Sequence, residues 1–263
     1  MGTLATLMEP AMINSRRLFA LGLVTAATVL AGPAGAWSWS SGERVNGNGD
    51  IATEARDAGA FDGVAVAGDF NVVIRTGSGH KVEVKADRNL LPYIETRVVE
   101  GGKGRTLQIE SKKGYNISSS THPSFIIELP ALRAISVAGS GNVKVEAMKA
   151  GAVDAAIAGS GDIRFANLEA ERLGMKVSGS GNIYATGRAA TASVSIAGSG
   201  DVRAAEFVSE DVKVSIAGSG DAQVNATKKL HVSIAGSGDV KYAGSPEISR
   251  SVAGSGSVRP LKQ

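Results

Sequence analysis

The sequence predicts an all-β fold, a single-domain parallel β-helix or β-solenoid with an N-terminal cap rich in strands. Three observations predict it. A Gly-Ser-Gly tripeptide recurs seven times in the C-terminal half, at intervals of 18 to 20 residues, and repeats of this length are typical of stacked coils. Glycine is abundant, at 34 residues, whereas aromatic residues make up only 5%. Val, Ile and Thr around frequent glycines indicate short strands joined by tight turns.

The N-terminus resembles a secretory leader. Arg16 and Arg17 precede an apolar run over 18–30, and Ala34-Gly35-Ala36 follows as a small-residue cleavage pattern. The run is shorter than the roughly 20 apolar residues that a membrane span needs. We therefore expect a cleaved signal peptide over 1–36, no membrane span after its removal, and a periplasmic or secreted product. The segment 15–19 resembles the twin-arginine export motif, and an ordinary Sec leader fits equally well.

The remaining chain reads as one domain. Residues 37–56 are rich in Ser, Gly and Asn and are predicted to form a flexible leader. The solenoid is predicted over 57–263, with N-terminal coils and a cap over 61–130 and the Gly-Ser-Gly repeats over 131–263. Strands are expected in the cap over 64–68, 70–74, 81–84, 106–109 and 125–129, with a short helical turn over 89–94.

Aligning the seven tripeptides shows an apolar residue on each side of every turn. The first glycines are Gly139, Gly159, Gly179, Gly198, Gly218, Gly236 and Gly254. Two positions before them stand Val137, Ile157, Val177, Ile196, Ile216, Ile234 and Val252, and four positions after them stand Val143, Ile163, Ile183, Val202, Ala222, Val240 and Val258. We expect both sets to face inward.

A single coil of this kind cannot fold alone. Ordering about 20 residues costs roughly 20–40 kcal/mol of backbone entropy, and each buried Val or Ile returns about 1.5–3 kcal/mol. Stacked coils share a core and pair every strand with its neighbours. The glycines then have a conformational reason, because a narrow turn needs positive φ or close backbone approach. The intervening serine hydroxyl is expected to bond along the stack.

Two polar ladders are predicted beside the turn. The acidic ladder, three positions after the first glycine, contains Asn142, Asp162, Asn182, Asp201, Asp221, Asp239 and Ser257. We expect its oxygens to accept from turn amides. Asp201, Asp221 and Asp239 are weak candidates for calcium, since Ca²⁺ takes six to eight oxygen ligands and this ladder supplies carboxylates from one side only.

The basic ladder, two positions further on, contains Lys144, Arg164, Tyr184, Arg203, Gln223, Lys241 and Arg259. Its five cations, Lys144, Arg164, Arg203, Lys241 and Arg259, can screen the acidic ladder and are the candidate binding residues. A third set of positions, one and three residues before the turn, is almost entirely Ser and Ala. It predicts a flat outward face that another protomer or the N-terminal strands could cover.

Several function classes lack support. No cysteine is present, which excludes disulfides, thiolate metal sites and a lipidated N-terminal cysteine. The net charge of +3 is too small to indicate nucleic-acid binding. His80, His122 and His231 share no motif and read as surface or turn residues. The carboxylates form a repeated ladder and not a singular cluster, so no catalytic residue and no cofactor are predicted.

The chain resembles a known family. Phe61 to Ile74, Asn89-Leu90-Leu91, the Leu129-Pro130-Ala131-Leu132 segment and the serial Gly-Ser-Gly-Asp/Asn turns together resemble the putative auto-transporter adhesin head GIN domain, or DUF2807. The resemblance covers about 57–263. It implies an exported bacterial envelope protein, all-β and solenoid-like, and carries over no catalytic residues. Many members are lipoproteins, from which this chain departs because its leader junction has no cysteine.

Two hypotheses of function follow. The first is a non-catalytic, adhesin-like envelope protein that binds an envelope polysaccharide or another protein, and that could form homo-oligomers through the Ser/Ala face. The alternative is a carbohydrate-active β-helix enzyme. The enzyme hypothesis requires a deep groove in which side chains of several coils converge.

Overall fold

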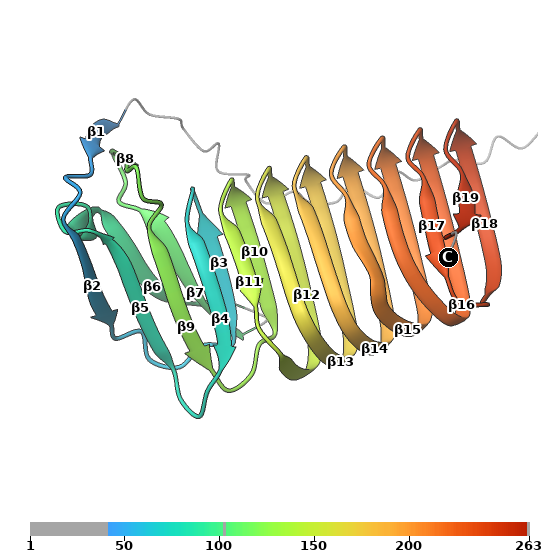
Figure 1. Ribbon diagram of the computed structural model, residues 1–263, viewed down its shortest axis with the longest axis horizontal. Coiled ribbons are helices and arrows are strands. Elements are labelled where there is room, and N and C mark those ends of the chain that lie inside the picture. The colour runs from blue at the N-terminus through green and yellow to red at the C-terminus, as the bar shows by residue number, and fades with distance from the viewer. Residues whose placement is uncertain (1–41, 102–103, 262–263) are drawn as a thin grey trace, which may run out of the picture. The chain divides into compact units, whose positions relative to one another are not determined.

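The computed structural model describes residues 42–101 and 104–261, which form one compact all-β unit (Figure 1). The predicted signal peptide, 1–36, lies outside these residues. Most strands belong to one continuous sheet that wraps into stacked coils. The predicted β-solenoid with a strand-rich N-terminal cap is confirmed. In the part of the chain that is described, no helix is long and apolar enough to cross a membrane.

The coils of the repeat are built from parallel strands. These are β10 (Ala134–Gly139), β11 (Asn142–Val145), β12 (Met148–Gly159), β13 (Asp162–Gly179), β14 (Asn182–Gly198), β15 (Val202–Gly218), β16 (Ala222–Gly236), β17 (Val240–Ala243), β18 (Glu247–Gly254) and β19 (Val258–Pro260). The long strands β13 to β16 bend and contribute to two faces. We call the strand segments that lead into Gly-Ser-Gly the approach face, and those that follow it the exit face.

Equivalent residues of successive coils pair in register. Val137 pairs with Ile157, Ile157 with Val177, and the first glycines of the turns pair likewise. The inward columns predicted on both faces are buried as far as Ile234 and Val240. Phe165 and Phe207 fill the core near the bend. The alternation of apolar and polar residues therefore sets the inward and outward faces, as expected for strands.

Both glycines of the turn are required, for different reasons. The first has positive φ in every copy, for example 138° at Gly159. The third packs against the coil before it, so that a Cβ on Gly161 would collide with the carbonyl oxygen of Gly141. The amides of Ser160 and Gly161 donate to the carbonyl of Gly139, at 2.9 and 3.1 Å. The serine side chains are exposed, so backbone amides make the bonds that we expected from the hydroxyls.

The N-terminal part combines coils with a cap. Its elements are β1 (Glu43–Asn46), β2 (Ile51–Arg56), β3 (Gly63–Ala67), β4 (Asn71–Thr76), β5 (Lys81–Asp87), the 3₁₀ helix η1 (Leu91–Tyr93), β6 (Ile94–Gly101), β7 (Gly104–Ser111), β8 (Tyr115–Ser118) and β9 (Ser124–Leu129). The cap strands and the short helical turn occur where the sequence predicted them. Antiparallel pairs β2–β5, β5–β9 and β6–β7 close this end.

The stacking order differs from the chain order. Strand β3 lies between β7 and β10, and β4 lies between β9 and β11. The coil formed by β3 and β4, which is first in the sequence, is therefore second in the stack. It lies between the coil of β7 and β9 and the coil of β10 and β11, so the connection from β9 to β10 crosses over it. Arg133 fixes this crossing with two hydrogen bonds to the Asp62 carboxylate, at 3.0 and 3.1 Å.

The described part of the predicted flexible leader is ordered, so that prediction is wrong over 43–56. Strand β2 pairs antiparallel with β5, and β1 pairs parallel with β8. The polar composition misled the prediction, because the side chains of β1 and β2 are mostly exposed while their backbones hydrogen-bond to the cap. Backbone pairing does not require apolar side chains.

Candidate functional site

The acidic ladder runs along the exit face directly after the turns. Each carboxylate accepts a hydrogen bond from the backbone amide of the equivalent residue in the next coil. The Asp221 amide donates to Asp201 Oδ1 at 3.1 Å, and the Asp239 amide donates to Asp221 Oδ1 at 2.8 Å. Ser257 donates its amide and hydroxyl to Asp239, at 2.9 and 2.8 Å. These contacts match the role predicted for the ladder, which is to satisfy amides at the turn.

In this ladder, Asp239 is stabilised in its charged form. The hydroxyl of Ser257, the Ser257 amide and Arg259 lower the pKa of Asp239, against desolvation, which raises it. Within residues 42–101 and 104–261, no group of three or more His, Cys, Asp or Glu side chains is arranged to hold a metal ion. One oxygen of each of Asp201, Asp221 and Asp239 is already engaged by an amide. Calcium binding stays an untested hypothesis.

The basic ladder lies next to the acidic one on the same face. Lys144 pairs in register with Arg164, Arg164 with Tyr184, and Tyr184 with Arg203. Arg203 contacts Asp201 at 3.4 Å, and Arg259 contacts Asp239 at 2.6 Å. The other three cations, Lys144, Arg164 and Lys241, form no ion pair with any described residue. The structure thus brings all five predicted binding residues into one column and leaves three of them available.

An aromatic ring divides the two central arginines of the ladder. The guanidinium of Arg164 lies 4.3 Å from the Tyr184 ring centroid, and that of Arg203 lies 5.5 Å from it. The sequence analysis counted Tyr184 only as a non-basic position in the basic ladder. Its contact with both arginines could have been predicted from the repeat, because residues at equal positions of successive coils are neighbours.

The outward side of the approach face is the predicted flat Ser/Ala face. Its side chains are exposed over most of the repeat, for example Ser195, Ser215 and Ser233. Near the bend it contains a shallow hollow of about 390 Å³, with Arg172, Lys213, Lys229, His231 and Thr191 among the lining residues. Association of protomers through this face stays a prediction.

The histidines lie in three separate places. His80 Nε2 lies 2.9 Å from the Phe61 carbonyl oxygen, and His231 lies on the approach face. His122 Nδ1 lies 3.0 Å from Asp69 Oδ2, in the cap, beside a cavity of about 280 Å³. No sequence pattern indicated this last contact, since Asp69 and His122 belong to different coils and share no motif.

The fold and its surface define a β-solenoid whose outward chemistry is carried by repeated polar ladders. The chain belongs to the family described as "Putative auto-transporter adhesin, head GIN domain", whose model matches residues 60–246. The resemblance seen in the sequence is therefore confirmed. A comparison with curated proteins found no match.

Solved structures share the fold. A putative lipid binding protein from Parabacteroides distasonis is 28% identical, with a TM-score of 0.70, and the match covers 84% of this chain and all of that one. A putative adhesin from Bacteroides fragilis is 23% identical, with a TM-score of 0.75, covering 82% and 100%. Another, from Parabacteroides merdae, is 23% identical, with a TM-score of 0.67, covering 84% and 100%.

Proposed function

We propose that this chain is a non-catalytic, exported envelope protein of the adhesin type that binds an anionic envelope polysaccharide along its basic ladder. The observation that carries the proposal is the unbroken register of the exit face. It places Lys144, Arg164, Arg203, Lys241 and Arg259 in one column parallel to the solenoid axis. Strands in such a stack are spaced about 4.8 Å apart, so the column presents charge at a regular spacing.

The energetics favour a polymer over a small ligand. A single exposed ion pair contributes about 0–1 kcal/mol, which is too little for specific capture. Several such contacts along one chain act together, because each contact after the first is intramolecular. A linear polyanion lying along the ladder can meet three to five cations at once, whereas a monosaccharide meets one.

The leader and the family support the location. We infer that 1–36 is removed during export by the Sec or twin-arginine route, and that the mature chain is periplasmic or secreted. The family's adhesin description agrees with a surface location. The N-terminal mass of protein recovered from the culture medium or periplasm tests this proposal, and we expect it to begin at Trp37.

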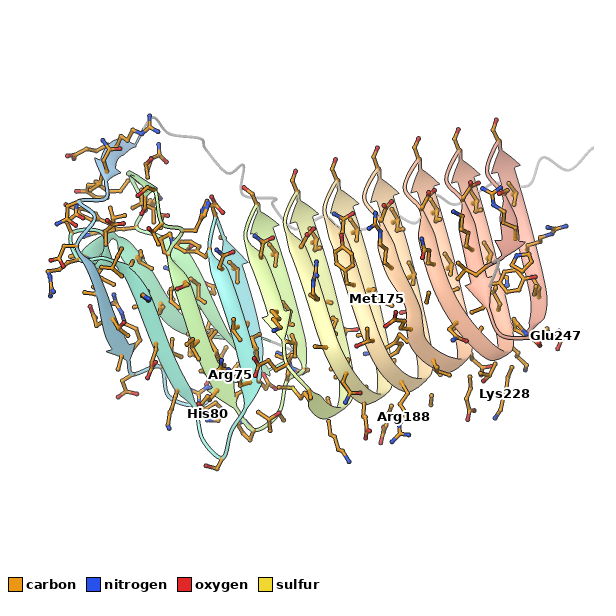
Figure 2. All side chains as sticks on the ribbon, viewed as in Figure 1. Arg75, His80, Met175, Arg188, Lys228 and Glu247 are labelled. Carbon is orange, nitrogen blue, oxygen red and sulfur yellow. The ribbon has the colours of Figure 1, made fainter. Side chains whose placement is uncertain are left out.

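Binding is tested with polygalacturonate as the polyanion and dextran as its neutral control. The Arg164→Ala/Arg203→Ala double variant is expected to lose polygalacturonate binding about tenfold. The matched control removes the same charge elsewhere. Lys176→Ala lies on the outward side of the approach face, and Arg188→Ala lies at the bend, at the end of the coils opposite the Gly-Ser-Gly turns (Figure 2). Equal losses in the two double variants, or no binding by the wild type, would overturn the proposal.

The Parabacteroides distasonis structure is described as a putative lipid binding protein, so binding of lipid by this chain is a second outcome that the same test can detect. Anionic phosphatidylglycerol vesicles offer phosphate to the ladder, and phosphatidylcholine vesicles are their uncharged match. We expect polygalacturonate to compete for the ladder more strongly than vesicles do, because the column is linear. Vesicle binding without polygalacturonate binding would contradict the polysaccharide assignment.

The enzyme hypothesis has less support. The acidic ladder is engaged with amides, and the hollow on the approach face is shallow, with Asp211 as the single carboxylate among its lining residues. Adhesin-family membership agrees with a binding role. Reducing-sugar release from polygalacturonate and dextran is expected to stay at background, and release that scales with protein concentration would favour the enzyme.

A further inference from the structure

Each Gly-Ser-Gly turn forms a corner of its coil, and this row of corners continues into the cap with a different sequence. Strand β3 pairs with β10, and β4 pairs with β11, so that Gly68, Asp69 and Phe70 occupy the corner before Gly139-Ser140-Gly141. Gly68 keeps the positive φ of the first glycine, at 123°. Asp69 replaces the exposed serine, and Phe70 replaces the third glycine.

Phe70 is accommodated because the next coil has no corner. Between β7 and β9 the chain leaves the stack over 112–123, in an excursion that includes β8. The Phe70 side chain turns inward to contact Phe125, with ring centroids 5.8 Å apart. The absent corner leaves a cavity of about 280 Å³, lined by Asp69, His122, Ser111, Asn116, Ser118 and Ser119, with Ile117 and Pro123 as apolar wall.

The walls of this cavity are held by a buried carboxylate. Asp87 is 1% exposed, and it accepts hydrogen bonds from the Ser119 hydroxyl and, at 2.5 Å, from the Gly49 amide. Strand β8 is also paired with β1, and the contact between Asp69 and His122 spans the cavity edge from one coil to the next. A buried charge costs stability unless its partners compensate, so its presence beside the cavity indicates a fixed arrangement of the excursion.

We propose that this cap cavity binds one uncharged saccharide unit. A sugar hydroxyl both donates and accepts, and the cavity supplies an anionic acceptor, an imidazole, an amide and the hydroxyls of Ser111 and Ser118. The apolar wall of Ile117 and Pro123 can face the C–H side of a ring. The volume is close to the lower limit of about 300 Å³ for ligand pockets, which suits one ring. The carboxylate of Asp69 disfavours an acidic sugar, in contrast to the basic ladder.

The site is independent of the polysaccharide ladder. Ladder binding is electrostatic and is expected to weaken at about 1 M NaCl, where the Debye length is about 3 Å. Binding of an uncharged sugar in the cavity is expected to change little with salt, because no ion pair forms between the protein and the ligand. The two sites also use different residues, so failure of one proposal leaves the other standing.

The test titrates residues 37–263 with glucose, galactose, mannose, N-acetylglucosamine and glucuronate, following amide chemical shifts. At least one neutral sugar is expected to bind, with shifts at 116–122 that persist in high salt. Asp69→Ser restores the residue found at the other corners, and Asn116→Ala removes the amide. Each is expected to weaken binding about tenfold, the loss typical of a removed charged or buried hydrogen bond.

Two controls make the result decisive. Ser180→Asp places a carboxylate on a Gly-Ser-Gly turn three coils away from Asp69, where there is no cavity, and is expected to leave binding unchanged. Arg164→Ala is likewise expected to have no effect on neutral sugars. The proposal is overturned if no neutral sugar shifts the cap resonances, if glucuronate binds better than its neutral counterparts, or if Asp69→Ser and Asn116→Ala, folded as the wild type, bind equally well.

Discussion

The guanidinium of Arg164 lies over the ring of Tyr184, 4.3 Å from its centroid, and the parallel register of β13 and β14 makes the two residues direct neighbours. Arg203 approaches the same ring from the following coil, at 5.5 Å. Cation–π contacts at exposed sites contribute about 0.5–1 kcal/mol each. Tyr184 therefore holds two of the ladder's cations in place on the exit face.

Replacing this ring should weaken polymer binding without removing charge. Tyr184→Ala is expected to reduce polygalacturonate affinity about two- to fivefold, the equivalent of one exposed cation–π contact. Tyr184→Phe keeps the ring and is expected to bind as the wild type does. Isothermal titration of the three proteins checks this, and equal affinity of the alanine variant would show that the ring does not order the arginines.

The third glycine of the turn should tolerate no side chain. A Cβ on Gly200 would collide with the carbonyl oxygen of Gly181 and lie 2.7 Å from Val177 Cγ1. Gly200→Ala is expected to lower the free energy of unfolding by about 1–3 kcal/mol or more, as overpacking does. Gly151→Ala is the control, because its Cβ would meet no atom within 4 Å. Denaturant unfolding measures both, and a similar midpoint for the two variants would contradict the close packing of the turns.

The repeat could be predicted because one period fixes every neighbour. Once the seven tripeptides are aligned, Arg164 must lie between Lys144 and Tyr184, and the ladders follow. The cap offered no such period. The insertion of β3 between β7 and β10, and of β4 between β9 and β11, depends on long-range pairing of unlike strands. The cap cavity depends on that order. The contact of Asp69 with His122 was therefore invisible in the sequence, whereas the basic ladder was not.

The buried carboxylate of the cap predicts acid sensitivity. The Ser119 hydroxyl and the Gly49 amide lower the pKa of Asp87 below its ordinary 3.8, although desolvation opposes them. Arg133 lowers the pKa of Asp62, and Ser257 lowers that of Asp239. A depressed folded-state pKa contributes stability that is present above the unfolded value and is lost as the pH falls through the folded value. The melting temperature should thus decrease when the pH is lowered beyond about 4.

The Asp87→Asn variant separates the contribution of the cap carboxylate to this pH dependence from the contributions of Asp62 and Asp239. It is expected to cost about 1–3 kcal/mol at neutral pH, the penalty for weakened hydrogen bonds at a buried site, and to flatten the acid limb of the melting curve. Asp57→Asn, at an exposed carboxylate beyond the other end of the β2–β5 pair, should leave both unchanged. A wild-type acid limb in the Asp87 variant would assign the pH dependence to other groups.

The arrangement of the last coil predicts that Arg250 prevents self-association of the protein through this end of the stack. Strand β18 aligns its Ile248, Arg250 and Val252 with the buried column of β16, and the two apolar side chains are 38% and 39% exposed. Arg250 lies between them and reaches the Val258 carbonyl at 3.5 Å. An inward-pointing charge on an edge strand discourages pairing with another chain. Arg250→Ile should raise the apparent mass in light scattering, whereas Lys144→Ile, on the exit face of a strand paired on both sides, should not.

Removing calcium should leave the fold unchanged. The amides of Asp221, Asp239 and Ser257 occupy one oxygen each of Asp201, Asp221 and Asp239, and all of these carboxylates approach from one face. Calcium wants six to eight oxygen ligands, which a single flat ladder already bonded to amides does not offer. The melting temperature of residues 37–263 is therefore expected to be the same in excess chelator and in excess CaCl₂. A rise with calcium that Asp221→Asn abolishes would instead make the ladder a metal site, and the amide contacts would then have to give way to the ion.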